Sequence, residues 1–402
     1  MHKTRTTRIL AAAVIVSAAV LVFAWTWTNP AGAVIGGLLA VSGVAALLPA
    51  ARRAPPRSPA PPEPAPPARP QAVKVAEPGD LDALIEQMLA QGRYALMLRP
   101  QIAPDLAAEQ FEKTLEALQV HMALVPEGAV VLGEAAGLDE QPDADHGRLR
   151  RQRTVRVAPY FLDRYPVTNR QYYEFVASGG YQQISFWDTA IWPAVLDFVD
   201  QTREPGPRFW RRGCYCSGEE NHPVVGICWY EASAYARWVG KRLPSDAEWV
   251  KAGAWPVALS DRRAAQRKFP WGDTMDRSKA NLWGSGPGRT LPVTDLAEGV
   301  SVGGIFQLIG NVWEWTRSDY TPSHFPHEEF IAESPLKSIR GGAFDTYFDN
   351  QATCQFQSGE LQIARKRNIG FRCALSVCDL MLYREAVRDA SGLETPAEEV
   401  TT

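Results

Sequence analysis

The sequence predicts an α+β fold with little regular secondary structure, preceded by a transmembrane helical hairpin and a small helical neck. Three observations support the α+β assignment. Short helix-type and strand-type runs alternate with Gly- and Pro-containing loops, no internal repeat is visible, and the 402 residues include 13 tryptophans. Large rings at that density fill space that regular elements leave open. The net charge of −3 gives no general attraction to nucleic acid, so none is expected as a partner.

Two apolar runs lie at the N-terminus, from Ile9 to Trp25 and from Ala33 to Ala51. Each has about 17–19 residues, enough to cross a bilayer as a helix. Residues 1–50 are therefore expected to form a two-helix transmembrane hairpin. Basic residues flank both outer ends, and the positive-inside rule then places the soluble part in the cytoplasm. This makes the chain a multi-pass protein of the inner (cytoplasmic) membrane.

A cleaved signal peptide is the alternative, because the small residues "AGA" at 31–33 resemble a cleavage site. If only one segment spans, the soluble part lies outside the cytoplasm. Six cysteines occur without metal-binding spacing, and a cytoplasmic location favours free thiols.

Residues 51–78 are a Pro-rich linker, because ten prolines fall between positions 51 and 80. Such a composition favours a polyproline-II spacer. Residues 79–121 are predicted to form the helical neck, with apolar residues at helical spacing in two segments. These residues are Leu81, Leu84, Ile85, Met88 and Leu89, then Leu106, Phe111, Leu115 and Leu118.

The main domain is expected at residues 122–378, followed by a polar, disordered tail at 379–402. "MALVPEGAVVLG" and "RTVRVAPYFLDRYPVT" are strand-type runs broken by Pro and Gly. "TNRQYYEFVASGG" predicts a helix capped by Thr168 or Asn169. Two more helices are predicted on either side of Pro244, and Ser245 with Glu248 three residues later forms a capping box for the second.

Seven segments in this order resemble the formylglycine-generating enzyme (sulfatase-modifying factor) family, over about residues 122–378. They are "MALVPEGAVVLG", "FLDRYPVTNRQYYEF", "HPVVGICWYEASAYARWVGKRLPSDAEWVKAG", "FPWGD" with "ANLW", "LIGNVWEWTRSDY", "IRGGAF" and "NIGFRCALS". The resemblance implies a variant of the C-type-lectin fold. It also implies oxidative chemistry, if the catalytic residues are present.

The oxidising members of that family carry two cysteines, five positions apart, shortly after a Gly-Gly pair. There the two thiolates bind copper(I), for which soft ligands are suited. The matching positions here are Thr346 and Gln351, and the nearest thiol, Cys354, matches a non-catalytic cysteine. Copper and formylglycine formation are therefore not expected.

Another branch of the family makes sulfur–carbon bonds with a non-haem iron held by a His-x3-His-x-Glu motif in a preceding helical domain. The neck here has one histidine, His121, and no such motif. His222, His324 and His327 show no spacing that requires a metal.

The resemblance also implies calcium. By the family match, Asn311 and Glu314 would bind it through side chains and Val312 through its carbonyl, in a turn that offers all three oxygen types. The alternative is that Glu314 pairs with an arginine such as Arg340 or Arg372. A second family site would use Asn281 and Leu282, but the usual acidic Asp-Gly-Phe stretch is missing and only Asp295 could substitute.

Two functions from different classes remain. The first is a non-catalytic module that binds a peptide, protein or small molecule through an aromatic and acidic surface. Its candidate residues are Phe344, Asp345, Tyr347, Phe348, Asp349 and Asn350. The second is an oxidoreductase of the same family with a site that the sequence does not reveal. The rings at 344, 347 and 348 could instead point inward and only fill the loop.

Overall fold

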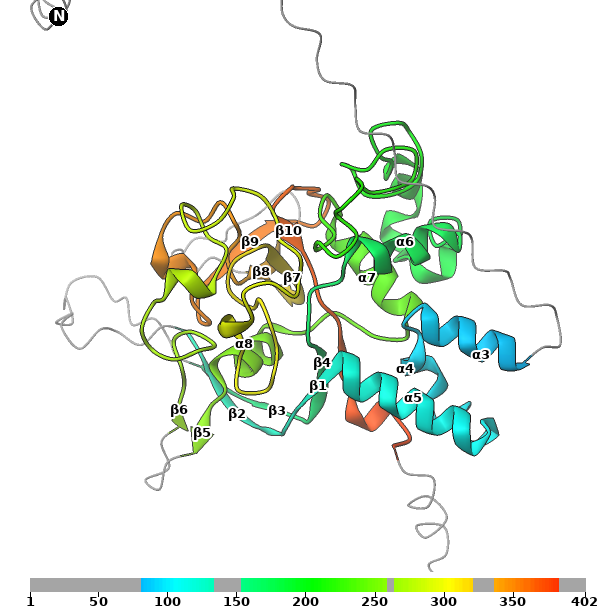
Figure 1. Ribbon diagram of the computed structural model, residues 1–402, viewed down its shortest axis with the longest axis horizontal. Coiled ribbons are helices and arrows are strands. Elements are labelled where there is room, and N and C mark those ends of the chain that lie inside the picture. The colour runs from blue at the N-terminus through cyan, green and yellow to red at the C-terminus, as the bar shows by residue number, and fades with distance from the viewer. Residues whose placement is uncertain (1–80, 134–152, 259–263, 321–335, 383–402) are drawn as a thin grey trace, which may run out of the picture. The chain divides into compact units, whose positions relative to one another are not determined.

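A computed structural model describes residues 81–133, 153–258, 264–320 and 336–382 of the chain (Figure 1). The expected membrane hairpin and Pro-rich linker lie outside these residues, as does the tail after residue 382. Among the described residues, no helix is both long enough and apolar enough to cross a bilayer.

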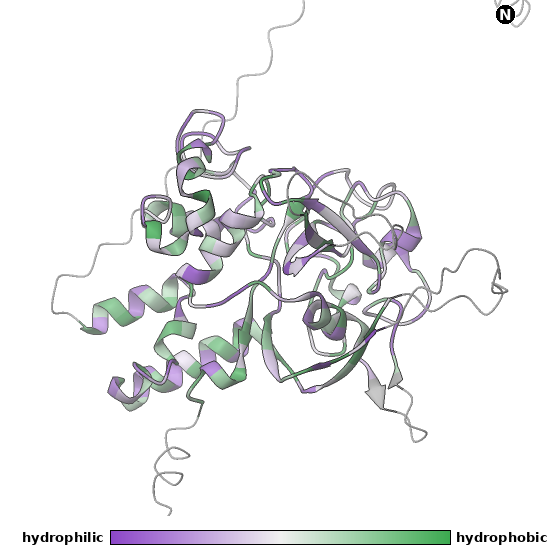
Figure 2. Ribbon diagram, turned by 180° about the vertical axis from the view of Figure 1, so that it is seen from behind, coloured by the Kyte–Doolittle hydropathy of each residue, from purple (hydrophilic) through white to green (hydrophobic). Residues whose placement is uncertain are grey.

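The neck is helical, as predicted, but it has an extra short helix between the two expected ones. Its helices lie together at one side of the fold, and each carries both polar and apolar residues (Figures 1 and 2). They are α3 (Leu81–Ala90), α4 (Tyr94–Met97), the 3-10 turn η2 (Ala103–Asp105) and α5 (Ala108–His121). Buried Ile85 and Phe111 share one apolar cluster with Phe161 and Leu375 of the main domain. The neck therefore completes a core that begins in that domain.

Short strands form the framework of the main domain. A three-stranded antiparallel sheet has the order β1-β4-β11, and a four-stranded sheet has the order β10-β7-β8-β9, with β10 and β7 parallel. Two small hairpins pair β2 with β3 and β5 with β6. The strands are β1 (Met122–Val125), β2 (Gly128–Leu132), β3 (Arg153–Val157), β4 (Tyr160–Asp163), β5 (Val257–Ala258), β6 (Ala264–Ala265), β7 (Trp313–Asp319), β8 (Leu336–Arg340), β9 (Gln357–Leu361), β10 (Ile369–Gly370) and β11 (Ala374–Ser376).

The α-helices among the described residues of the main domain are α6 (Asn169–Ala177), α7 (Trp229–Trp238) and α8 (Asp246–Ala254). Thr168 caps α6, since its hydroxyl accepts a hydrogen bond from the Gln171 amide. Ser245 and Glu248 form the predicted capping box of α8. Both caps satisfy backbone donors that a helix start leaves unpaired, so local sequence fixes where these helices begin.

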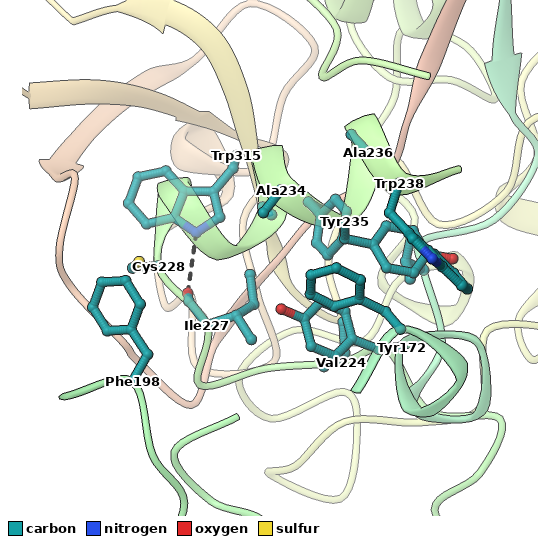
Figure 3. Packing of buried hydrophobic residues seen from close by; sticks show 14 of the residues in the cluster. Tyr172, Phe198, Val224, Ile227, Cys228, Ala234, Tyr235, Ala236, Trp238 and Trp315 are labelled. Carbon is teal, nitrogen blue, oxygen red and sulfur yellow. Dashed lines mark hydrogen bonds between the residues drawn. The ribbon is translucent and has the colours of Figure 1, made fainter. Parts of the chain in front are cut away.

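Aromatic rings fill the space between these short elements, as the tryptophan count indicated. Tyr172 of α6 stacks on Tyr235 of α7 with ring centroids 5.3 Å apart (Figure 3). The indole of Trp315 donates a 3.3 Å hydrogen bond to the Ile227 carbonyl. Burying an indole with its N–H satisfied adds apolar area without an unpaired donor.

A buried ion pair of the main domain contacts the neck through Tyr94. The Lys241 ammonium lies 2.8 Å from the Asp163 carboxylate and donates a 2.7 Å hydrogen bond to the Tyr94 hydroxyl. Burial by itself lowers the pKa of Lys241, but the Asp163 charge outweighs it, so the pKa is raised. Beside this pair, Arg93 and Arg99 of the neck donate to carbonyls at the C-terminus of α7, where a helix favours cations.

The first residues of the expected disordered tail are ordered. Asp379 pairs with Arg99 at 3.2 Å, and the Met381 amide donates a 2.8 Å hydrogen bond to the Leu98 carbonyl. The boundary predicted at residue 379 is therefore wrong, because the chain still contacts the neck through residue 382.

Lys241→Met should destabilise the fold by about 3–5 kcal/mol, because it strands the buried Asp163 carboxylate without its partner. Urea unfolding followed by tryptophan fluorescence measures this. Lys113→Met is the matched control, since Lys113 makes only exposed pairs with Glu86 and Glu109 and its loss should leave the midpoint unchanged. Equal midpoints for both variants would contradict the role of the pair.

Candidate functional site

The loop that follows β8 begins with two glycines whose backbone conformations other residues rarely adopt. Gly341 and Gly342 have φ values of 98° and 77°, in the region that favours glycine. A Cβ on Gly341 would lie 2.4 Å from the Leu308 carbonyl oxygen. The close approach to Leu308 therefore requires glycine at position 341.

The two positions that match the family's cysteines hold no reactive group. Thr346 is buried, and its hydroxyl accepts a 2.8 Å hydrogen bond from the Ala343 amide. Gln351 ends the 3-10 turn η7 (Asp349–Gln351). Cys354 is fully buried, and burial raises the pKa of its thiol, so the thiolate is strongly disfavoured. The loop therefore offers neither a thiolate pair nor a reactive single thiol.

The candidate binding residues lie largely at the surface. Tyr347 and Phe348 are 62% and 60% exposed, and their rings make an edge-to-face pair with centroids 5.1 Å apart. Asp345, Asp349 and Asn350 are also exposed, while Phe344 is half-buried. Tyr347 and Phe348 thus point outward, and only Phe344 partly fills the loop.

Trp283, which no sequence pattern indicated, extends this face. Its ring is 56% exposed, and its amide donates a 3.2 Å hydrogen bond to the Thr346 carbonyl. We call Trp283, Phe344, Asp345, Tyr347, Phe348, Asp349 and Asn350 the aromatic surface.

Arg277, which no sequence pattern indicated either, contacts the backbone of the aromatic surface. It donates hydrogen bonds to the carbonyls of Trp283 (2.8 Å) and Tyr347 (3.2 Å) and pairs with Asp349 at 2.5 Å. Seventy residues separate Arg277 from Tyr347, so no local pattern could show this contact. A guanidinium suits the role because its planar fork carries several donors in fixed directions.

A cavity of about 710 Å³ lies beside these contacts, lined among others by Trp271, Asp276, Arg277 and Asp349. Its volume falls in the range of small-molecule and side-chain pockets. Ring faces and carboxylates together can hold an apolar or aromatic group through stacking and a polar group through hydrogen bonds.

The candidate calcium residues already have protein partners. Glu314 is fully buried, and its two oxygens accept hydrogen bonds from Arg372 at 2.7 and 2.8 Å and from the Trp249 indole at 2.8 Å. Arg372 is thus the arginine that the alternative interpretation required, whereas Arg340 pairs with Asp246 at 2.8 Å. The Asn311 side-chain oxygen accepts two hydrogen bonds from other protein groups, at 3.1 and 2.9 Å.

The described histidines and Arg365 make contacts within the fold. His121 stacks on Tyr94, and burial, with the Lys241 charge, lowers its pKa. His222 is buried and hydrogen-bonds Thr290. Within the described ranges, no three His, Cys, Asp or Glu side chains cluster as metal ligands; His324 and His327 lie outside those ranges. Arg365 pairs with buried Glu231 at 2.9 Å.

Residues 107–377 match a family described as "Sulfatase-modifying factor enzyme 1-like domain". The chain belongs to the sulfatase-modifying factor family. It is 37% identical to the hercynine oxygenase of Mycolicibacterium smegmatis over 243 residues, which are 55% of this chain and 53% of that protein. The chain therefore spans about half the length of that relative.

Two further comparisons cover most of the other protein. The formylglycine-generating enzyme of Thermomonospora curvata is 28% identical over 295 residues, covering 63% of this chain and 92% of the enzyme. The solved structure of PvdO from Pseudomonas aeruginosa is 21% identical and covers 64% of this chain and 94% of that chain, with a TM-score of 0.42. The named relatives of this sulfatase-modifying factor domain thus include enzymes.

A thiol-reactive dye should label two of the six cysteines in the native protein, because Cys216 and Cys378 are exposed and the other four are buried. All six should react after denaturation. The measurement is the absorbance of the released dye at mildly alkaline pH. A third native thiol that disappears in Cys354→Ser would contradict the inert environment assigned to Cys354.

Proposed function

We propose that this sulfatase-modifying factor domain is a non-catalytic binding module that grips a peptide or a small ligand with its aromatic surface. One observation carries the proposal. The loop that matches the family's catalytic loop has Thr346 and Gln351 in place of the two cysteines, and it presents Tyr347 and Phe348 to solvent instead.

The surroundings of the two rings support a binding role. Large aromatic side chains that stay exposed as a pair are typical of binding hot spots. Arg277 hydrogen-bonds the backbone carbonyls of both Trp283 and Tyr347, which favours one arrangement of the surface before a ligand arrives. Little ordering of side chains would then be lost on binding. The neighbouring cavity, which is open to solvent, adds a concave surface beside the rings.

We also propose that the domain is tethered to the inner membrane, with the soluble part in the cytoplasm. This rests on the two apolar runs within residues 1–51 and on the basic residues that flank them. The Pro-rich composition of residues 51–78 suits a stiff spacer between bilayer and domain. A membrane and a peptide, protein or small-molecule ligand are the proposed partners, without nucleic acid.

An oxidoreductase function is the second candidate, and the names of the relatives favour it. The chain resembles proteins named hercynine oxygenase and formylglycine-generating enzyme. Against it stands the chemistry of the loop, which lacks the cysteine pair of the copper enzymes. The neck likewise lacks the histidine motif of the iron branch, and its single histidine is packed against Tyr94.

Selection of a random peptide library on the full-length chain in detergent tests the binding proposal. We expect related peptides to be enriched, and the double substitution Tyr347→Ala with Phe348→Ala to weaken their binding by about tenfold or more, as hot-spot truncation does. Titration of a labelled, enriched peptide measures the affinity.

The matched control is Trp192→Ala with Leu196→Ala. These two apolar residues are 45% and 85% exposed on another element, η4 (Thr189–Asp197), and their loss should not change the affinity. Failure to enrich any peptide, or equal binding by the Tyr347/Phe348 double variant, would contradict a peptide-binding aromatic surface.

A further inference from the structure

Calcium is the cofactor that the family resemblance implies, and the described residues can be tested for their fit to it. A calcium ion needs six to eight oxygen ligands that converge at 2.3–2.6 Å. Oxygens that accept hydrogen bonds from N–H groups lying between them do not form such a shell, because the N–H groups occupy the position that the ion would need. The two implied sites lie at Glu314 and at Asn281.

At Glu314, a guanidinium occupies the place of a cation. Arg372 and Glu314 are both fully buried, and the Arg372 fork contacts both carboxylate oxygens. The same guanidinium donates to three backbone carbonyls, at 3.0, 3.2 and 2.8 Å: those of Asp163, Arg164 and Phe306. One carboxylate and three carbonyls are the oxygen types that calcium gathers. Here they are gathered by a permanent organic cation.

At Asn281, three side-chain amides join the neighbouring loop segments. The Nδ2 group of Asn281 donates to the Arg289 carbonyl at 2.9 Å and to Asn311 Oδ1 at 3.1 Å. The Nδ2 group of Asn311 donates to the Leu291 carbonyl at 3.0 Å and to Gln307 Oε1 at 2.6 Å. We call Asn281, Asn311 and Gln307 the carboxamide staple.

The third member of the carboxamide staple closes the far end of the loop. Gln307 Nε2 donates to the carbonyls of Pro292 (2.9 Å) and Asp295 (3.0 Å). Four loop carbonyls, at 289, 291, 292 and 295, thus accept amide hydrogens where an ion would need open lone pairs. Asp295, the substitute ligand considered from the sequence, contributes its backbone to this network.

One buried oxygen of the carboxamide staple has no hydrogen-bond donor: Oδ1 of Asn281. A Cβ built on Gly286 would lie 1.8 Å from this oxygen, so the Cα hydrogen of Gly286 points directly at it. This open side-chain acceptor of the Asn281 site is therefore covered by backbone rather than directed into a space for an ion.

We propose that this chain is held together without calcium: the Glu314–Arg372 pair and the carboxamide staple take the place of the two ions. The consequence reaches the aromatic surface. Trp283 lies two residues after Asn281, and the Phe344 amide donates a 3.2 Å hydrogen bond to the Asn311 carbonyl. The staple, rather than a metal, then positions both sides of that surface.

Thermal unfolding of the full-length chain in detergent, with millimolar calcium or with excess EDTA, tests this proposal. We expect melting temperatures that agree within about 1 °C, whereas an ion bound only by the folded state would raise the value by several degrees. Elemental analysis after gel filtration should find no stoichiometric calcium. A calcium-dependent rise of several degrees, or about one retained calcium per chain, would overturn the proposal.

Glu314→Gln separates the ion-pair role from a calcium role. We expect it to lower the melting temperature by the same amount in calcium and in EDTA, because it strands the buried Arg372 charge in both buffers. Glu127→Gln is the control, since Glu127 pairs with Arg156 at an exposed site. This substitution should leave the melting temperature unchanged in both buffers. A decrease in melting temperature in calcium but not in EDTA would overturn the proposal. If the variant does not fold, the melting temperatures of the wild-type chain in calcium and in EDTA decide.

Discussion

The buried pair of Glu314 and Arg372 is the interaction on which the other parts of this domain depend. Both side chains are fully shielded from water, where an isolated charge would be prohibitively unfavourable. Each therefore requires the other, together with the remaining hydrogen bonds. Through those bonds the pair joins β7, the end of β4, the indole of α8 and the loop at Phe306. Elements too short to be stable alone are thereby held in one arrangement.

Because buried contacts hold this fold together, the side chains of its surface loops can differ without loss of the fold. The Gly341–Gly342 turn follows from a close backbone approach, and it directs the next loop outward whatever that loop carries. In this chain the loop carries exposed rings rather than thiols, and Arg277 holds it from 70 residues away. Membership of a family that includes enzymes therefore settles the fold but leaves the activity to the residues of the loop.

The sequence predicted the features that depend on neighbouring residues. The caps at Thr168 and Ser245 were visible because a capping box needs only three-residue spacing. The need of Glu314 for a partner was also visible, but Arg340 and Arg372 could not be distinguished. Strand pairing sets Arg340 opposite Glu314, yet the Arg340 side chain pairs with Asp246, and Arg372, between β10 and β11, pairs with Glu314. Contacts such as Lys241 with Tyr94, 147 residues apart, leave no periodic signal and were missed. The outward direction of Tyr347 and Phe348 likewise depended on the turn geometry.

The claim that this domain binds a ligand without catalysis is tested most directly by measuring bound redox metal and oxygen uptake on the same preparation. Full-length protein, purified from cells supplied with copper and iron, would be analysed for both metals and then mixed with oxygenated buffer and a cysteine-containing peptide. We expect only trace copper and iron and no oxygen uptake above the buffer rate. About one copper or iron per chain, or sustained oxygen uptake, would contradict the non-catalytic account and favour the oxidoreductase.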